Sequence, residues 1–505
     1  MFSRIPEKYL TLICMCLWGA AILYAGAVRF DAFALDEGAA HALLLNWSLS
    51  DQIVNPITTY GGPDFRALLF IPLGLYWPGS IIAAKVFTIA VMFMAGLGLY
   101  YWSRVHQSAE NAMIATGLLL IAPVTLQNID NISVGPYLLL MFGLGAWLDT
   151  KYRNSAHAVS SLYFTQCVLI AITVTLHPMG LAYPAALAWH WYKMPKSDKQ
   201  QKQVWLGIGI AVIIVLVMQT GWIALGWLSN PAPALDAAFW GYNVIPSPGA
   251  SHWLGYALLP ILILIMLVSA RSALSNLMGS MLLASVLIGF LVADESWALV
   301  SMAVILFYGI PLLLKLNQKI HLHSFLGQRG LVMLAIFILA SVFMSANKDH
   351  VRQIRSDLLS NEDQLIAALA QVANDKKQPF LAASEWPART MIVCKRDVLR
   401  LPPAASSGAA LLKSIKGLTH VMFNHRDPHF SQLAKNFSEI TSQTETLSIQ
   451  DGGVIIKIKG TKTGNDKNKA GAATNPVSKS IEKPNENAKP GAENTLPDNP
   501  APTHE

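Results

Sequence analysis

Residues 34–47 read ALDEGAAHALLLNW and lie a few residues after the first apolar segment, 9–28. An acidic pair, Asp36 and Glu37, opens the stretch, and apolar residues then recur with helical spacing. The apolar positions are Ala40, Leu43, Leu44 and Trp47. Spacing of i, i+3, i+4 and i+7 predicts a helix that lies in a membrane interface with one face in lipid. The acidic pair then has two interpretations. It places a carboxylate where a lipid-linked substrate would lie, or it only begins the helix at the positive end of its dipole.

The composition places the chain among polytopic membrane proteins. Hydrophobic residues make up 53% of the sequence and charged residues only 13%, which is about half the charged fraction of a soluble domain. Segments long enough to cross about 30 Å of hydrocarbon recur as far as residue 346. We expect about eleven transmembrane helices, the sixth being short enough for a broken or re-entrant segment. Their approximate positions are 9–28, 80–102, 110–126, 131–149, 158–176, 179–192, 204–228, 253–270, 274–293, 296–314 and 329–346.

The net charge of +7 follows the expected topology. Lys and Arg concentrate in alternate loops, for example at 193–202, and are scarce in the loops between them. This asymmetry is the positive-inside rule, and it places the N-terminus in the cytoplasm and everything after residue 346 outside. The charge therefore indicates the topology of a multi-pass membrane protein whose outer side is a periplasm or its equivalent, and it does not indicate a nucleic-acid partner. The N-terminal segment also matches a cleavable signal peptide, but the later spans favour a retained first helix.

The region 347–460 predicts a small exported (periplasmic) α/β domain. Short apolar runs alternate with helical periodicity, and a Gly-Gly pair at 452–453 separates two runs typical of a β-hairpin. The expected strands are 380–383, 390–393, 418–423, 446–449 and 454–458, and the expected helices are 361–374 and 409–415. Cys394 is expected in a buried strand. Residues 461–505 contain no aromatic residue and are rich in Lys, Asn, Pro and Glu, which predicts a disordered tail.

The rest of the first exported loop, 51–78, contains a second candidate functional residue. A Gly-Gly-Pro sequence at 61–63 indicates a turn, and the apolar residues that follow Arg66 predict a second interfacial helix over 67–72 with an aromatic belt after it. A guanidinium group matches phosphate oxygens, so Arg66 is suited to clamp a lipid phosphate. Snorkelling to ordinary lipid headgroups explains Arg66 equally well, and the sequence leaves both interpretations open.

These features together resemble the C-type glycosyltransferase (GT-C) superfamily of integral membrane enzymes, in particular its bacterial dolichyl-phosphate-mannose–protein mannosyltransferase-like and aminoarabinose-transferase-like branches. In those families the first span leads into an exported loop with an Asp-Glu pair, two juxtamembrane helices and a Lys-Pro-Pro-Leu-like segment. Here residues 36–37 match the pair, residues 66–69 (Arg-Ala-Leu-Leu) take the place of Lys-Pro-Pro-Leu, and residues 85–86 (Lys-Val) lie near the family's Arg-Leu. The resemblance is divergent, since it covers 1–460 in architecture but only about the first 90 residues in motif.

The resemblance implies an enzyme that moves a sugar from a polyprenyl-phosphate donor to an acceptor hydroxyl on the periplasmic face, with inversion. An acceptor hydroxyl is a poor nucleophile at neutral pH, so a positioned carboxylate must accept its proton. Asp36 is the expected general base, and Glu37 is expected to orient Asp36 or the acceptor. Arg66 and Lys85 are expected to offset the phosphate charge. A divalent metal ion could share that task, although the sequence shows no ligand cluster that demands one.

Three further residues are weaker candidates for substrate binding: His177, Trp240 and Tyr242. His177 precedes a proline at an outer membrane edge, where such a residue more often just ends a helix, and the two aromatic residues fit an interfacial belt as well as a sugar-stacking surface. The acceptor is a lipid, a glycan or a protein. A transporter or flippase of lipid-linked substrates is the alternative function, although Lys85 is almost the only charge within a predicted span. A non-catalytic envelope assembly protein is the other.

Overall fold

We analysed a computed structural model of the full chain. It describes residues 19–20, 23–24, 26–33, 35–48, 69–77, 80–153, 160–192, 209, 252–292, 296–319, 330–355, 360–375, 379–402, 405–424, 430–450 and 453–459. The expected tail at 461–505 lies outside these residues, as do Arg66, Trp240 and Tyr242. All statements about the structure below refer to the described residues.

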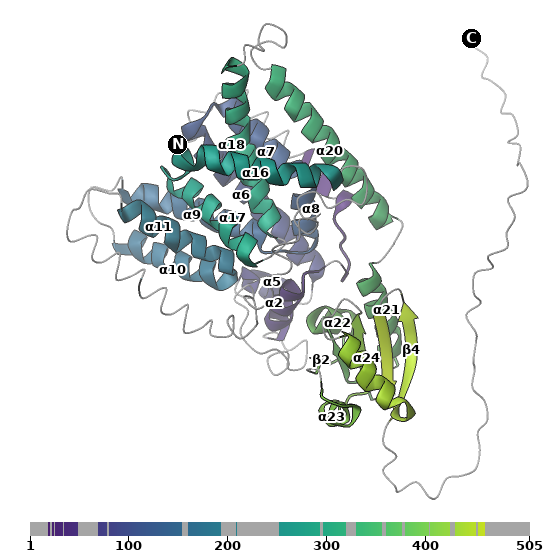
Figure 1. Ribbon diagram of the computed structural model, residues 1–505. Helices are drawn as coiled ribbons and strands as arrows, with labels where there is room; N and C mark the ends of the chain where they lie inside the picture. The colour runs from purple at the N-terminus through teal and green to yellow at the C-terminus, as the bar shows by residue number, and fades with distance from the viewer. Residues whose placement is uncertain are drawn as a thin grey trace, which may run out of the picture. The chain divides into compact units, whose positions relative to one another are not determined.

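Helices make up most of the described chain before residue 356 (Figure 1). In chain order they are α2 (Glu37–Ser48), α5 (Ile71–Tyr76), α6 (Ile81–His106), α7 (Ala109–Ile121), α8 (Pro123–Asp130), α9 (Gly135–Arg153), α10 (Ser160–Leu176), the 3-10 helix η2 (Pro178–Leu181), α11 (Ala182–Tyr192), α16 (His252–Ala273), α17 (Leu277–Val292), α18 (Trp297–Lys319) and α20 (Gly330–Arg355). Within the described residues, α6, α16, α18 and α20 each contain a segment long and apolar enough to cross a membrane. The bent pair α7 and α8 adds a fifth if it forms one span. The chain is therefore a polytopic helical membrane protein.

Local sequence explains where these helices begin and bend. α6 begins after Ser80, whose hydroxyl accepts the N–H of Ala83 at 3.1 Å and so satisfies one of the N–H groups that a first helical turn leaves without a partner. Between α7 and α8, Ala122 has extended backbone angles and Pro123 opens the next helix, where a missing N–H costs nothing. The two helices meet at 51°.

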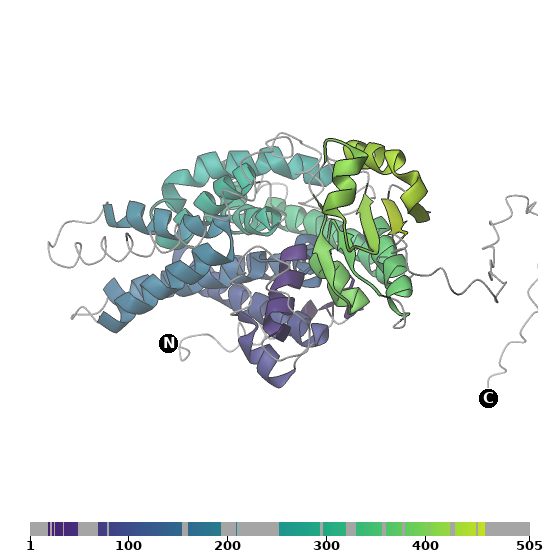
Figure 2. The ribbon, with the colours of Figure 1, turned by 90° about the horizontal axis from the view of Figure 1, so that it is seen from below.

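The expected spans agree with the helices wherever the structure describes them, with differences in detail. Four of them correspond to α6, α16, α18 and α20, and the short sixth segment corresponds to η2 with α11. Helix α11 contacts α10; both are labelled in Figure 1 and have the same blue colours in Figure 2. The expected span 110–126 is bent rather than straight. α20 continues to Arg355, so the expected domain boundary at 346 falls inside a helix. Most of the span 9–28 and all of 204–228 except residue 209 lie outside the described residues, and the count of eleven stays a prediction.

The described part of the loop after the first expected span contains helices α2 and α5, but α2 packs differently from the expectation. Ala40, Leu43 and Leu44 are buried within the protein, and α2 contacts α5 and a helix of the C-terminal domain. The expectation that this apolar stripe faces lipid is therefore wrong for these three residues, and the side chain of Trp47 lies outside the described set. Helical periodicity identifies a buried face, but it does not say whether lipid or protein covers that face.

The C-terminal region forms an α/β domain with a five-stranded sheet. Its strands are β1 (Ala382–Ser384), β2 (Val398–Arg400), β3 (His420–Asn424), β4 (Thr444–Gln450) and β5 (Gly453–Ile458). The order across the sheet is β2-β1-β3-β5-β4. β1 pairs in parallel with β2 and with β3, whereas β5 pairs antiparallel with β3 and β4. The expected hairpin around 452–453 is thus confirmed as β4 and β5.

Helices cover both faces of this sheet. They are α21 (Asn361–Ala373), α22 (Pro387–Cys394), α23 (Gly408–Ser414) and α24 (Phe430–Glu439). Successive strand residues point to opposite faces. Val421 and Phe423 share a buried cluster with α23 and α24, whereas Met422 shares one with α21, α22 and the membrane helices.

One strand expectation in this domain is wrong. Residues 390–393 belong to α22, and Cys394 is buried at the end of that helix. A short apolar run fits a strand and a buried helix equally well, and Pro387 at the first position of α22 favours the helix. β2 and α24 were not among the expected strands and helices.

Candidate functional site

Asp36 lies at the start of α2, where hydrogen bonds hold both its side chain and its backbone. Its side-chain Oδ2 accepts the N–H of Ala39 at 3.3 Å, and its backbone N–H donates to the carbonyl oxygen of Asn131 at 2.9 Å. The first contact is a helix cap, so the interpretation that the acidic pair begins a helix is correct for Asp36. A carboxylate offers about four acceptor positions. One capping bond is therefore compatible with a further role as a proton acceptor.

The turn that holds Asp36 also holds a buried ion pair. Lys85 of α6 donates to Asp130 Oδ1 at 3.0 Å, and the two side chains are 0% and 3% exposed. The backbone N–H of Arg29 donates to the same oxygen at 2.8 Å, and His350 Nε2 of α20 lies 3.6 Å from Asp130 Oδ2. Asp130 therefore joins the end of the first span, α6, α8 and α20 at one carboxylate.

The backbone after Asp130 is strained. Ile132 is fully buried and has φ of 54°, a left-handed conformation that a β-branched residue rarely adopts. Such a conformation costs about 1–3 kcal/mol and persists only where the surrounding structure enforces it. Hydrogen bonds on both sides enforce it here, from the N–H of Ile132 to Ile129 and from the N–H of Ser133 to Asn128. The turn thereby presents the carbonyl of Asn131 to Asp36 in a fixed position.

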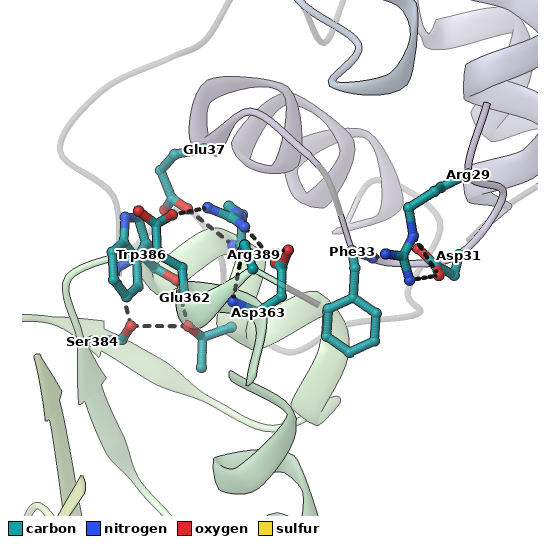
Figure 3. Close-up of polar contacts among 11 residues, drawn as sticks. Arg29, Asp31, Phe33, Glu37, Glu362, Asp363, Ser384, Trp386 and Arg389 are labelled. Atoms are coloured by element: carbon teal, nitrogen blue, oxygen red, sulfur yellow. Dashed lines mark hydrogen bonds and ion pairs between the residues drawn. The ribbon is translucent and has the colours of Figure 1, made fainter. Parts of the chain in front are cut away.

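Glu37 binds the C-terminal domain (Figure 3). Its Oε1 accepts the N–H of Ala388 at 2.6 Å and its Oε2 accepts the N–H of Arg389 at 3.1 Å. Burial raises the pKa of the Glu37 carboxyl to about 7, although the two N–H groups and the Arg389 charge oppose that rise. We expected Glu37 to orient Asp36 or the acceptor. In the structure both of its oxygens bind α22.

Arg389 extends the same contact into the C-terminal domain. Its guanidinium donates to Asp363 Oδ1 at 2.6 Å and to Glu362 Oε2 at 3.1 Å, both at the start of α21, and it lies over the ring of Trp386. Burial alone would lower the pKa of Arg389, but Asp363 and Glu362 raise it above its usual value. In Figure 3 these residues form one group with Glu37, whereas Arg29 and Asp31, an ion pair at 2.7 Å, lie apart from it.

The structure brings together only part of the expected site. Asp36 and Lys85 are both tied to the turn at 130–131, while His177 is buried elsewhere and accepts the N–H of Met179 at 3.2 Å as the cap of η2. That cap agrees with the helix-end interpretation of His177. Among the described residues no group of three or more His, Cys, Asp or Glu side chains could hold a metal ion, so the geometry identifies no ligand set for one.

Asp130 and Arg389 were not among the predicted site residues. The sequence nevertheless contains a signal for Asp130. A lysine within a transmembrane segment requires a counter-charge, because an unpaired buried ammonium is costly. Lys85 therefore predicts an acidic partner near a span end, and Asp130 is the acidic residue between 111 and 148. Arg389 left no comparable signal, since its partners Glu362 and Asp363 lie 27 and 26 residues away in sequence and are brought to it by the fold of the C-terminal domain.

Solved structures share this fold over nearly the whole chain. ArnT from Cupriavidus metallidurans in the apo state aligns with a TM-score of 0.54 at 10% identity, over 89% of this chain and 98% of that one. ArnT from the same organism bound to undecaprenyl phosphate aligns with a TM-score of 0.52 at 10% identity, over 88% and 97%. The apo oligosaccharyltransferase of Archaeoglobus fulgidus aligns with a TM-score of 0.53 at 12% identity, over 86% and 71%.

These similarities define the class of fold. No family model and no curated protein matches the sequence, so the likeness rests on structure alone. The aligned structures, ArnT and an archaeal oligosaccharyltransferase, are two kinds of GT-C glycosyltransferase. The chain has the GT-C fold, as its resemblance to that superfamily predicted.

Proposed function

We propose that the protein is an inverting membrane glycosyltransferase that moves a sugar from a polyprenyl-phosphate donor to an acceptor hydroxyl. The observation that carries the proposal is the fold match, which spans 97% of an ArnT structure described as bound to undecaprenyl phosphate. The acceptor would be a lipid, a glycan or a protein on the periplasmic side of a bacterial inner membrane. A fold alone does not determine an activity, so the residues of the loop must support the proposal too.

Asp36 is the proposed general base. In the reaction the acceptor oxygen bonds to the anomeric carbon as the bond from that carbon to the phosphate oxygen breaks. The polyprenyl phosphate leaves with the bonding electrons, and Asp36 takes the hydroxyl proton. Attack from the face opposite the phosphate inverts the anomeric centre. The fixed backbone of Asp36, held at Asn131, supports this role because a general base works only in a defined position.

Two cations are proposed to offset the charge of the departing phosphate. Arg66, in the same loop, would bind phosphate oxygens through its guanidinium group. Lys85 is buried and paired with Asp130, so its positive charge would act on the phosphate directly only after that pair opens. His177, Trp240 and Tyr242 are retained as proposed contacts of the acceptor. A divalent metal ion is not required by this proposal, because the two cations supply the charge.

The test is turnover of a radiolabelled donor by membranes that contain the full chain. A panel of undecaprenyl-phosphate sugars is supplied, and the release of unlabelled lipid phosphate and the transfer of label to membrane acceptors are measured. Asp36→Asn keeps the shape of the side chain but cannot take the proton, so transfer should fall by about a hundred- to ten-thousand-fold. Asp31→Asn is the matched control, because Asp31 is an exposed carboxylate in the same loop.

The control and the alternatives give distinct outcomes. Asp31→Asn should transfer sugar at the wild-type rate. Equal rates for Asp36→Asn and wild type would remove Asp36 from the active site. Transport of labelled lipid without cleavage of the sugar–phosphate bond would indicate the flippase alternative, and inactivity with every donor would favour a non-catalytic assembly protein.

A further inference from the structure

Helix α22 has no N-terminal cap of its own. Trp386 occupies the cap position without a side-chain hydrogen bond to the first turn, and Pro387 follows it. The N–H groups of Ala388 and Arg389 would therefore lack partners within the domain, at the positive end of the helix. Glu37 accepts both of them, from a position 351 residues earlier in the chain. The C-terminal domain thus obtains a helix cap from the first exported loop.

The place of this contact in the sheet is informative. α22 leads from β1 to β2, and the chain then returns past β1 to β3 on its other side. The strand order reverses between β1 and β3, and α22 begins at that edge, at Pro387, three residues after the end of β1. In doubly wound α/β domains an anionic ligand binds at such a point, at a helix N-terminus. Here the carboxylate of Glu37 occupies the N-terminus.

The docked carboxylate is adjacent in sequence to Asp36. Asp36 is held through its backbone N–H at Asn131, and Glu37 is held through both carboxylate oxygens at α22. Two consecutive residues are therefore anchored to two different parts of the protein. If either anchor were lost, the first turn of α2 could rotate and displace the Asp36 carboxylate.

We propose that Glu37 is a positioning residue that docks the loop carrying Asp36 onto the anion-binding end of the C-terminal α/β domain, so that this domain acts as part of the catalytic unit. The inference rests on the proposed function for its consequence, but the docking itself is tested independently. The charged groups around Glu37 are Asp36 on its own loop and Arg389 on α22, which is itself paired with Glu362 and Asp363 of α21. α5, also packed on α2, carries no charged residue.

The first arm of the test is hydrogen exchange of the purified full-length protein in nanodiscs. Glu37→Ala removes both acceptors, so exchange in peptides covering α22 and α2 should rise by about 10- to 100-fold. Glu37→Gln keeps one acceptor oxygen and should give a smaller rise. The matched control is Glu439→Ala. Glu439 accepts the N–H of Gly408 at 2.6 Å, at the start of α23, and does not contact α2. Its loss should raise exchange around α23 only.

The second arm is turnover of the radiolabelled undecaprenyl-phosphate sugar that the wild type uses. Glu37→Ala should lower kcat by about 10- to 100-fold, because a small displacement of a general base has that cost, while the donor KM changes little. Glu37→Gln should recover part of kcat, and Glu439→Ala should keep the wild-type value. Partial recovery by Gln distinguishes positioning from collapse of the loop.

Each outcome has a definite meaning. Unchanged exchange in α2 and α22 for Glu37→Ala would overturn the docking. Raised exchange in Glu37→Ala together with the wild-type kcat would show that docking does not help to position Asp36, and this result would also overturn the proposal. If the wild type turns over no donor, the proposed function fails, yet the exchange arm still decides whether Glu37 docks the loop.

Discussion

Replacing either member of the Lys85–Asp130 pair should destabilise the protein strongly, and replacing both should not. Lys85→Met leaves the Asp130 carboxylate buried with the Arg29 N–H as a donor. Asp130→Asn keeps an acceptor for that N–H but leaves a fully buried ammonium. Removing one partner of a buried ion pair costs about 3–5 kcal/mol, because the remaining charge is uncompensated. We expect a loss of that size from each single variant.

The double variant Lys85→Met with Asp130→Asn contains no buried charge at this position. Methionine nearly fills the volume of the lysine stem, and asparagine still accepts the Arg29 N–H. Replacing a whole buried pair by neutral groups is often close to neutral. We therefore expect a loss of about 1 kcal/mol or less for the double variant, and a coupling free energy of about 5 kcal/mol or more between the two positions.

The measurement is the free energy of unfolding of the purified full chain in mixed micelles with increasing SDS. Lys151→Met is the matched control, since Lys151 lies at the end of α9 with an exposed side chain beside Trp147; its loss should change stability by less than about 0.5 kcal/mol. If the single variants behave like Lys151→Met, or if the double variant loses the sum of the two single losses, the buried pair does not exist in the membrane.

Two further predictions concern the first exported loop. Arg66→Ala should lower kcat/KM for the donor by about 10- to 100-fold, through loss of a charge-assisted hydrogen bond, and Arg66→Lys should restore part of it; an unchanged value for Arg66→Ala assigns Arg66 to lipid headgroups. The raised pKa of Glu37, from 4.5 to about 7, means that the docked carboxyl holds its proton more tightly than the undocked one. The free energy of docking is then most favourable below pH 4.5. It becomes less favourable, by at most about 3 kcal/mol, as the pH rises to about 7. Exchange protection of α22, corrected for intrinsic rates, should be higher at about pH 5 than at about pH 8 in wild type and equal in Glu37→Gln; protection that grows with pH contradicts the sign.

Patterns that depend on neighbours in sequence predicted the fold well. The long apolar segments became α6, α16, α18 and α20, and β5 begins at Gly453, the second residue of the Gly-Gly pair. In both cases the information is local, since a span needs length and hydrophobicity and a hairpin needs a turn between two apolar runs. The helix from Asn361 was predicted for the same reason, and Ser360 and Asp363 cap each other at its start.

Patterns whose meaning depends on a distant partner were ambiguous or wrong. The apolar face of α2 was assigned to lipid, but a helix from the C-terminal domain packs on α2 instead. Residues 390–393 were assigned to a strand because a short apolar run fits a strand and a buried helix equally well. The first error comes from the contact between α2 and α22, which no local pattern contains.

The acidic pair shows why the site was only partly predictable. An Asp-Glu dipeptide at a helix start is consistent with capping, catalysis and docking, and local sequence cannot divide these roles between two adjacent carboxylates. In the folded protein the two carboxylates make different contacts. Asp36 caps its own helix and is held to the turn after Asp130, whereas Glu37 caps a helix of another domain. A loop that is anchored at both residues of the pair keeps Asp36 in one place. The C-terminal domain can therefore influence the proposed chemistry through the backbone of α2, and a search for catalytic groups within that domain would overlook its role.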